Sequence, residues 1–228
     1  LLGKMLAIPA PKRMESFDIS NISGTDIVAS MVVFQEGKPK KSDYKRFKVE
    51  GLTDQDDYAS MRQVVTRRFV HYKAGDKGFD EAPDLLLIDG GRGQVGAVRQ
   101  ALRGTALEHV PTFGMVKDDH HRTRAIVDSD GREIAINMNR GTFTFITAIQ
   151  DETHRFANAY RKQQMKQKSY SSTLTEVPGV GPKTAKALMA QFKSVSAVKE
   201  ATPDQLENTP GVGRQMAQTI YEYFHPQG

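Results

Sequence analysis

The chain has 228 residues, of which 38% are hydrophobic, and its formal net charge is +5; because a usual domain has about 100 to 150 residues, we expect two domains. The sequence contains no cysteine, which excludes a disulfide framework and a thiolate zinc site, so any metal must be held by oxygen or imidazole. No apolar run approaches the roughly 20 residues of a membrane span, and the N-terminal residues lack a signal-peptide pattern, so we expect a cytoplasmic protein that binds no membrane.

The first third of the chain predicts an antiparallel meander followed by a helix. Apolar and β-branched residues gather in three segments that we interpret as strands, at 15–21, 26–34 and 44–49. Thr53 is the predicted N-cap of the helix, and Asp56 and Asp57 lie in its first turn. Apolar residues then recur at helical spacing from Tyr58 to Val70, so we expect this helix to pack on the sheet.

The middle of the chain predicts alternating strands and helices. A continuous apolar run at 85–88 ends at Asp89, Gly90 and Gly91, as a strand buried on both faces does. The patterns that follow predict, in order, a helix at 94–102, a strand at 112–116, a hairpin of 125–127 with 134–136, and a helix at about 142–165. This order describes an α/β fold whose mixed sheet has an antiparallel and a parallel half, and RNase H-like domains have this order.

The closing helix is followed by a change in composition. Residues 163–172 are rich in Gln, Lys and Ser without apolar periodicity, so we interpret them as a linker and place the domains at 1–168 and 169–228. From Arg155 onward there are 10 Lys and Arg against 5 Asp and Glu, whereas the preceding part has 22 of each. This distribution suits an enzyme that holds a metal in one domain and a polyanion in the other; the alternative is an unevenly charged solvated surface.

The second, all-α domain contains an internal repeat. Residues 177–185 read VPGVGPKTA, and residues 209–217 read TPGVGRQMA. Each copy resembles the helix-hairpin-helix motif, in which glycines allow a tight turn and the next helix directs its positive dipole end at a phosphate. Two copies resemble the tandem domain of DNA repair and recombination proteins, although one Gly-x-Gly at a helix start is also an ordinary turn. The residues that we expect to bind the DNA backbone are Gly179, Val180, Gly181, Lys183, Gly211, Val212, Gly213 and Arg214.

Acidic residues of the first domain form a candidate metal site. Mg²⁺ or Mn²⁺ takes oxygen ligands, and phosphodiester hydrolysis needs carboxylates that converge from different elements. Asp18 lies in the first strand between apolar residues, where a carboxylate is costly unless something compensates it. Asp89 ends the buried strand, at the edge where the sites of open α/β sheets gather. Since these two strands are neighbours in an RNase H-like sheet, we expect Asp18 and Asp89 to face each other.

Two further residues complete the candidate site. Asp57, or alternatively Asp56, lies in the first turn of the helix after the meander, and His154 lies on the closing helix; in this fold both reach the same sheet edge. Structural interpretations stay open as well, with Asp57 as an acid that compensates a helix dipole and Asp89 as a turn former before glycine. Taken alone, His154 is better explained as a surface histidine, whereas nothing structural needs an acid at Asp18.

A second polar cluster follows the predicted strand at 112–116. It has the sequence Lys117-Asp118-Asp119-His120-His121, and we interpret most of it as a solvated loop before the hairpin. Two interpretations stay open for Lys117. Its ammonium either contacts the scissile phosphate and stabilises developing charge, or it has no role in catalysis.

Four segments resemble the UvrC family, and they occur in the family's order. They are ESFDISN at 15–21, GLT with DDYA within 51–59, LIDGGRGQ at 87–94 and DETHRFA at 151–157. The resemblance is to the C-terminal half of this incision subunit of the bacterial UvrABC nucleotide excision repair system, and it extends from Pro11 through the second hairpin motif. Where the family often has Glu-Ser-His, this sequence has Glu152-Thr153-His154, which keeps the histidine.

The resemblance implies a Mg²⁺- or Mn²⁺-dependent endonuclease that cuts DNA on the 5′ side of a lesion. Asp18, Asp57, Asp89 and His154 lie on the family's catalytic positions. The implied partners are damaged double-stranded DNA with a bubble or junction, and the UvrB–DNA pre-incision complex. The family's GIY-YIG nuclease domain and its UvrB-binding segment have no counterpart in this sequence, so we expect no 3′ incision and poor recruitment by UvrB.

For the mechanism, we expect Asp18 and Asp89 to hold one metal ion, with Asp57 shaping the metal or its water shell. His154 then serves as general base or orients the attacking water. Two alternatives stay open. An endonuclease V-like enzyme shares the fold but reads a flipped, deaminated base without protein partners. A non-catalytic DNA-binding module would carry vestigial acids, and its DNA binding would not depend on Asp18.

Overall fold

The computed structural model describes residues 1–21, 27–51, 56–117 and 123–226. The chain divides into two compact units, Leu1–Arg161 and Lys162–Gly228. The boundary predicted from the sequence, between residues 168 and 169, lies inside a helix of the structure, α4 (Arg140–Thr175). No helix in the described part of the chain is long and apolar enough to cross a membrane.

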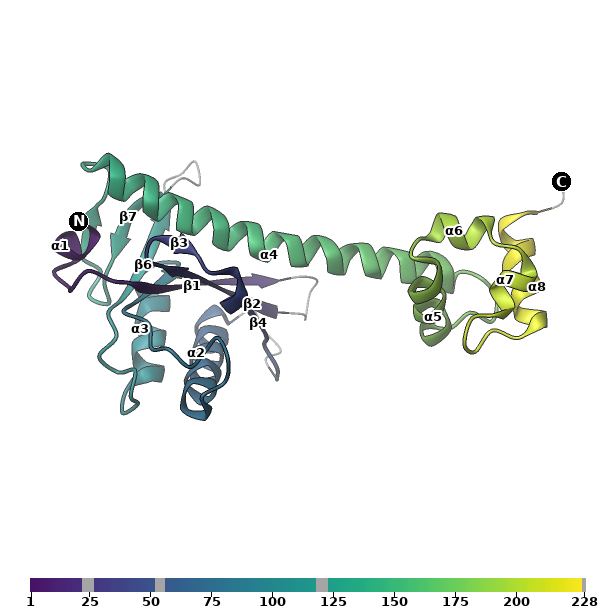
Figure 1. Cartoon of the computed structure of the whole chain (residues 1–228), viewed down its shortest axis with the longest axis horizontal. Helices are drawn as coiled ribbons and strands as arrows, with labels where there is room; N and C mark the ends of the chain where they lie inside the picture. Colours follow the sequence, from purple (N-terminus) through teal and green to yellow (C-terminus); the bar gives the residue numbers. More distant parts are fainter. Residues whose placement is uncertain (22–26, 52–55, 118–122, 227–228) are drawn as a thin grey trace. The chain divides into compact units, whose positions relative to one another are not determined.

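The described residues of the first unit form a mixed sheet of eight strands, in the order β3-β2-β1-β5-β6-β7-β8, with β4 paired to β2 (Figure 1). The pairs β1·β5 and β5·β6 are parallel, and the other pairs are antiparallel. The bounds are β1 Arg13–Asn21, β2 Ile27–Gln35, β3 Lys38–Pro39, β4 Lys45–Lys48, β5 Leu85–Asp89, β6 Thr112–Lys117, β7 Thr123–Val127 and β8 Glu133–Ala135. This sheet confirms the predicted α/β fold class and the predicted adjacency of the strands that carry Asp18 and Asp89.

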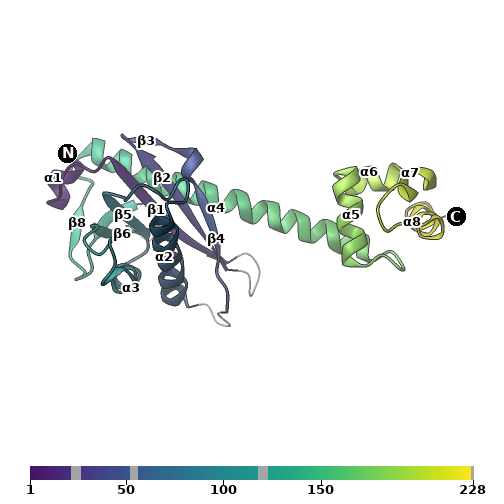
Figure 2. The same cartoon turned by 60° about the horizontal axis from the view of Figure 1, so that its bottom comes forward.

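Helices cover both faces of this sheet and make three layers (Figures 1 and 2). Helices α2 and α3 cover one face, where Met61 and Val98 pack with Phe17 of β1. The opposite face is covered by α1 and by α4, where Ile149 packs with Leu87 of β5. The bounds of the remaining helical elements are α1 Leu2–Leu6, a 3-10 turn Lys41–Asp43, α2 Asp57–Ala74 and α3 Arg92–Leu102.

The alternation of side chains along β1 and β5 decides which face receives the acids. Phe17 and Ile88 belong to the core under α2 and α3. Because successive side chains of a strand point to opposite faces, the next residues, Asp18 and Asp89, point to the face that α4 covers. The register pairs Phe17 with Ile88 across the two strands. The two acids therefore follow side by side at the C-terminal edge of the parallel strands.

A buried ionic network ties α2 to the start of β1. Glu15 accepts two hydrogen bonds from Arg68, at 2.8 and 2.7 Å, and Arg13 approaches the same carboxylate at 3.2 Å. Arg13 also donates to Asp43 at 2.8 Å. These four side chains belong to residues that are at most 6% exposed. Removing one partner would leave an uncompensated charge in the interior.

Helix α4 is longer than the sequence pattern predicts. The predicted end near Met165 is wrong, because the helix continues to Thr175 through the segment interpreted as a linker. Gln and Lys are good helix formers, and neither glycine nor proline occurs between Gly141 and Pro178. The lack of apolar periodicity in this segment therefore indicates a helix without an apolar face there, and not a break in the helix.

The start of α2 also differs from the prediction. The N-cap is Asp56, whose carboxylate accepts a hydrogen bond from the amide of Ala59 at 2.9 Å. The predicted cap, Thr53, lies outside the described residues. Asp56 thus has a structural role at the helix start, in keeping with the preference of aspartate for this position.

In the second unit, the two copies of the repeat adopt the same local structure. Gly179 and Gly211 have φ angles of 80° and 85°, in the left-handed region that glycine tolerates best. Gly181 and Gly213 are the N-caps of the helices that follow. The helices of this unit that begin after α4 are α5 Pro182–Phe192, α6 Val195–Glu200, α7 Pro203–Glu207 and α8 Arg214–Phe224, and they share one apolar core. The predicted all-α second domain is thereby confirmed.

Candidate active site

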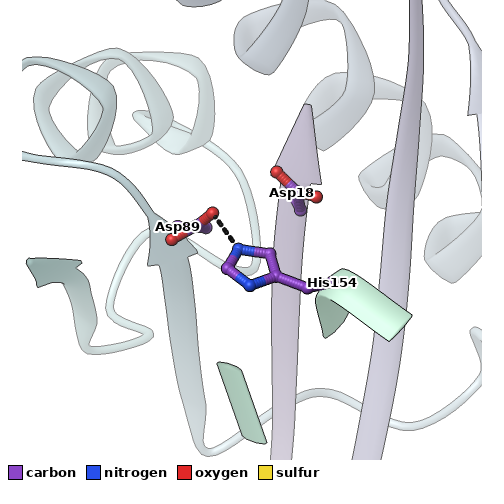
Figure 3. A group of neighbouring side chains, drawn as sticks. All are labelled: Asp18, Asp89 and His154. Carbon is purple, nitrogen blue, oxygen red and sulfur yellow. Dashed lines mark hydrogen bonds and ion pairs between the residues drawn. The ribbon is translucent and has the colours of Figure 1, made fainter. Parts of the chain in front are cut away.

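Three side chains from three elements converge at the C-terminal edge of the parallel strands (Figure 3). Asp18 comes from β1, Asp89 from the last position of β5, and His154 from α4. One ligand atom of each lies within 4.8 Å of the other two. Among the described residues, this is the one group of three or more His, Asp or Glu side chains with such spacing. The structure therefore brings together three of the residues predicted from the sequence.

Buried contacts hold α4 over this edge. Ile146 and Ile149 of α4 are fully buried against the sheet. The hydroxyl of Thr153, also fully buried, lies 2.9 Å from the hydroxyl of Ser16 on β1. His154 follows directly in the chain, so its position over the strand ends is set by the packing of its neighbours.

Asp89 makes most of the polar contacts of the site. Its Oδ2 lies 2.6 Å from Nε2 of His154 and accepts a hydrogen bond from Nζ of Lys117 at 3.1 Å. Its Oδ1 accepts a hydrogen bond from Nε2 of Gln150 at 2.7 Å. The Nζ of Lys117 lies 2.9 Å from Nε2 of His154 as well. Lys117 is thus part of the site, and its neighbours 118–121 lie outside the described residues.

The pKa values of the two carboxyl groups, Asp18 and Asp89, are shifted in opposite directions. Burial, and then the nearby charge of Asp89, raise the pKa of Asp18 to about 6. Burial also acts to raise the pKa of Asp89, but the hydrogen bond and charge of His154, together with Lys117, outweigh it and hold this pKa below its ordinary value. The hydrogen bond to Asp89 in turn raises the pKa of His154. Of the two carboxyl groups, Asp18 therefore takes up a proton at the higher pH.

The residues present fit a divalent cation. Two carboxylates and an imidazole are oxygen and nitrogen donors of the kind that Mg²⁺ and Mn²⁺ accept. The hydrogen bond that Asp18 receives from the described residues comes from Ser20 and is long, at 3.3 Å. Burial and the nearby charge of Asp89 disfavour the ionised form of this partly buried acid more than the charges of His154 and Lys117 favour it. A cation between the two acids would favour the ionised form.

Asp57 is not brought to this group. It is exposed at the first position of α2, and it is absent from the cluster of ligand atoms within 4.8 Å. In this structure its position is that of an acid in the first turn of a helix, which compensates the helix dipole. The predicted role of Asp57 in shaping a metal site therefore has no support from the geometry.

The sequence patterns missed two residues of the site. Gln150 contacts Asp89, and the hydroxyl of Thr123 on β7 donates a hydrogen bond to Oε1 of Gln150. The spacing of Gln150 and His154 was the available signal, because residues four apart lie on the same face of a helix. The sequence offered no such signal for Thr123, because its contact with Gln150 depends on how β7 lies next to β6.

The hairpins of the second unit expose only part of the predicted DNA-binding set. Lys183 and Arg214 are exposed at the starts of α5 and α8. Val180 and Val212 are at most 5% exposed, and their amides donate to carbonyl groups within the same turns. The side chains of these two valines therefore belong to the domain core, and their assignment to DNA binding stays a prediction. The glycines and the two cations stay as the predicted phosphate contacts.

Two families match the chain. The family described as UvrC RNAse H endonuclease domain matches residues 3–158, and the SAM-like helix-hairpin-helix tandem family matches residues 171–225. The curated relatives named UvrABC system protein C include one from Acetivibrio thermocellus, 44% identical over 95% of this chain and 37% of its own length. Another, from Clostridium acetobutylicum, is 42% identical over 94% of this chain and 36% of its own length. The chain thus spans little more than a third of these relatives.

Solved structures give a weaker likeness. An endonuclease V from Ciona intestinalis, in complex with a DNA that contains an inosine, matches 47% of this chain and 46% of its own at 20–21% identity, with a TM-score of 0.35–0.36 in two structures. Human ENDOV matches 57% of this chain and 72% of its own at 14% identity, with a TM-score of 0.33. These scores are too low to support a statement about function.

Proposed function

The chain belongs to the UvrC family, and we propose that it hydrolyses one phosphodiester bond of DNA on the 5′ side of a lesion. The observation that carries this proposal is the convergence of Asp18, Asp89 and His154 at one sheet edge. It is supported by the match of the UvrC RNAse H endonuclease domain to residues 3–158, which include all three. The relatives are much longer than this chain, so incision within the UvrABC system and the UvrB–DNA complex as partner are part of the proposal.

We further propose that Asp18, Asp89 and His154 would hold a Mg²⁺ or Mn²⁺ ion. Such an ion, when bound, neutralises charge on a phosphate and activates water. In this assignment, Nε2 of His154 is the third donor, in the place that the sequence predicted for Asp57. The distance of 2.6 Å between Nε2 of His154 and Oδ2 of Asp89 supports this assignment, because two ligand atoms this close can reach the same cation.

Lys117 is proposed to face the phosphate. Its side chain is 29% exposed, and its ammonium lies 3.1 Å from Oδ2 of Asp89. A positive charge in this position stabilises negative charge that develops on the phosphate oxygens during hydrolysis. In the reaction, the oxygen of water bonds to phosphorus and the bond from phosphorus to the 3′ oxygen breaks. The products are a 5′-phosphate and a 3′-hydroxyl.

The second unit is proposed to hold the DNA backbone. Its two hairpins each place an exposed cation, Lys183 or Arg214, at the start of a helix whose first amides have no acceptor within the helix. Contacts of this kind bind phosphates without reading bases. The unit would thus add affinity and leave the position of the cut to DNA structure and to partners.

The position and chemistry of the cut test this function. A duplex with a central bubble and a different label at each end of one strand would be incubated with the chain and Mn²⁺. We expect one cut on the 5′ side of the bubble, with ends that DNA ligase rejoins. A cut that requires an inosine and no bubble would instead support the endonuclease V-like alternative, and binding without cutting would support the non-catalytic one.

A further inference from the structure

Gln150 is a buried polar residue whose side chain is directed at the candidate active site. It lies on α4 one helical turn before His154 and is only 2% exposed. Its Nε2 donates a hydrogen bond to Oδ1 of Asp89 at 2.7 Å. A buried amide needs hydrogen-bond partners, and this one has a carboxylate as its acceptor.

The orientation of the Gln150 amide is determined by its two neighbours. A carboxylate accepts hydrogen bonds, and the NH₂ group of the amide faces Oδ1 of Asp89. The other end of the amide, Oε1, then faces the hydroxyl of Thr123, which donates to it. Thr123 is 6% exposed, and it pairs with Lys117 across the β6·β7 ladder, next to an irregularity of the register. A chain of two hydrogen bonds thus connects β7 to Asp89.

This chain of hydrogen bonds leaves one oxygen of Asp89 for the site. With Oδ1 engaged by Gln150, it is Oδ2 that lies 2.6 Å from His154 and 3.1 Å from Lys117. Rotation of the carboxylate would break the bond to Gln150 and move both oxygens away from these partners. Gln150 also carries no charge, so it orients the acid without competing with a cation for it.

We propose that Gln150 is a positioning residue, which directs Oδ2 of Asp89 at the cation of the proposed endonuclease, and that Thr123 supports it. Groups that hydrogen-bond to metal ligands typically change metal affinity or activity by about 10- to 100-fold when they are lost. The inference rests on the proposed function, because it needs Asp89 to be a ligand. It goes beyond that function by assigning a role to two residues that do not touch the cation or the DNA.

The competing explanation is that Gln150 only fills space between α4 and the sheet. Gln150→Met separates the two, because methionine keeps the length and volume of the side chain and removes the amide. Thr123→Val removes only the hydroxyl, and Thr123→Ser keeps it. Thr147→Val is the matched control, since Thr147 lies on the same helix and its buried hydroxyl has no hydrogen-bond partner among the described residues.

The test measures the Kd for Mn²⁺ by isothermal titration calorimetry, and kcat and KM for cleavage of a bubble DNA, on the full chain. We expect Gln150→Met to weaken Mn²⁺ binding about tenfold or more and to lower kcat with KM for DNA unchanged. Thr123→Val should weaken binding less, whereas Thr123→Ser and Thr147→Val should match the wild type. Circular dichroism would establish that each variant is folded.

Wild-type Mn²⁺ affinity in folded Gln150→Met would overturn the proposal. If Gln150→Met does not fold, the pair of Thr123 variants decides, and equal Kd values for Thr123→Val and Thr123→Ser would overturn it. A failure of the proposed function looks different. In that case the wild type itself binds no Mn²⁺, or Asp89→Asn binds it as tightly as the wild type.

Discussion

The Nε2 atom of His154 lies 2.6 Å from Oδ2 of Asp89, and this contact joins the closing helix to the end of a central strand across 65 positions of sequence. The same oxygen accepts a hydrogen bond from Lys117, and a carboxylate oxygen of Asp18 lies within 4.8 Å of the other ligand atoms. The pKa values of Asp18, Asp89 and His154 depend on one another through these contacts. The group therefore acts as one electrostatic unit, and a change in any member should be felt by the others.

The contact between His154 and Asp89 predicts that His154→Ala weakens metal binding as well as cleavage. Loss of the third donor should raise the Kd for Mn²⁺ about tenfold or more, and cleavage should fall with it. Calorimetric titration with Mn²⁺ measures the first effect. His71→Ala is a control, because His71 is a partly exposed histidine of α2 that pairs with Asp76. Unchanged Mn²⁺ affinity with lost cleavage would instead assign His154 the role of general base.

The raised pKa of Asp18 predicts a pH-dependent effect of Asp18→Asn on the metal-free protein. Since the folded-state pKa is about 6 and the ordinary value is 3.8, the folded state binds more protons than the unfolded state between these values. The free energy of unfolding therefore falls as the pH rises through this window, and asparagine, which resembles the protonated acid, removes that loss. The gain in stability should be about 1 kcal/mol larger at pH 8 than at pH 5.

Urea unfolding in the presence of a chelator measures this difference. The pKa of His154 is also raised in the folded state, so its contribution to the free energy of unfolding falls as the pH rises. Because His154 is present in both proteins, the comparison of the two isolates the effect of Asp18. Asp130→Asn, in an exposed turn, is the control substitution. A gain of the same size at both pH values would contradict a raised pKa of Asp18.

The buried network around Glu15 predicts that Arg68→Ala strongly destabilises the first unit. Arg68 donates to both carboxylate oxygens of Glu15 and to the carbonyl groups of Phe79 and Glu81. Truncation leaves the Glu15 charge buried with Arg13 alone, and losses of about 3–5 kcal/mol are typical of such changes. Denaturant unfolding measures it, with Arg99→Ala on the exposed face of α3 as the control. A loss below about 1 kcal/mol would mean that the interior is more hydrated than its burial indicates.

The two hairpins predict that Lys183→Ala with Arg214→Ala weakens DNA binding and leaves the metal site intact. The logarithm of the binding constant falls linearly with the logarithm of the salt concentration, and each cation that contacts a phosphate contributes about one unit to this slope. The double variant should therefore reduce the slope by about two. Fluorescence anisotropy at several salt concentrations measures the slope. Lys4→Ala, an exposed lysine of α1, is the control. An unchanged slope would exclude the hairpins as the backbone contact.

The fold and the two acids of the site could be predicted because the signals for them are local. Asp18 and Asp89 stand out as acids within or at the end of apolar strands, and the order of the elements makes those strands neighbours. The place of Asp57 depends on how α2 lies relative to the sheet, which no local pattern determines. Gln150 was missed for a similar reason, since its partner Asp89 is 61 positions away in the sequence.

The role of Asp18 in metal-dependent incision can be measured by cleavage of a bubble-containing duplex, with the wild type, with Asp18→Ala and with the wild type in a chelator. A metal site that contains Asp18 predicts that the wild type cuts 5′ of the bubble with Mg²⁺ or Mn²⁺, and that both the substitution and the chelator abolish the cut while DNA binding persists. Cutting by Asp18→Ala at the wild-type rate, or cutting that continues without a divalent cation, would contradict it.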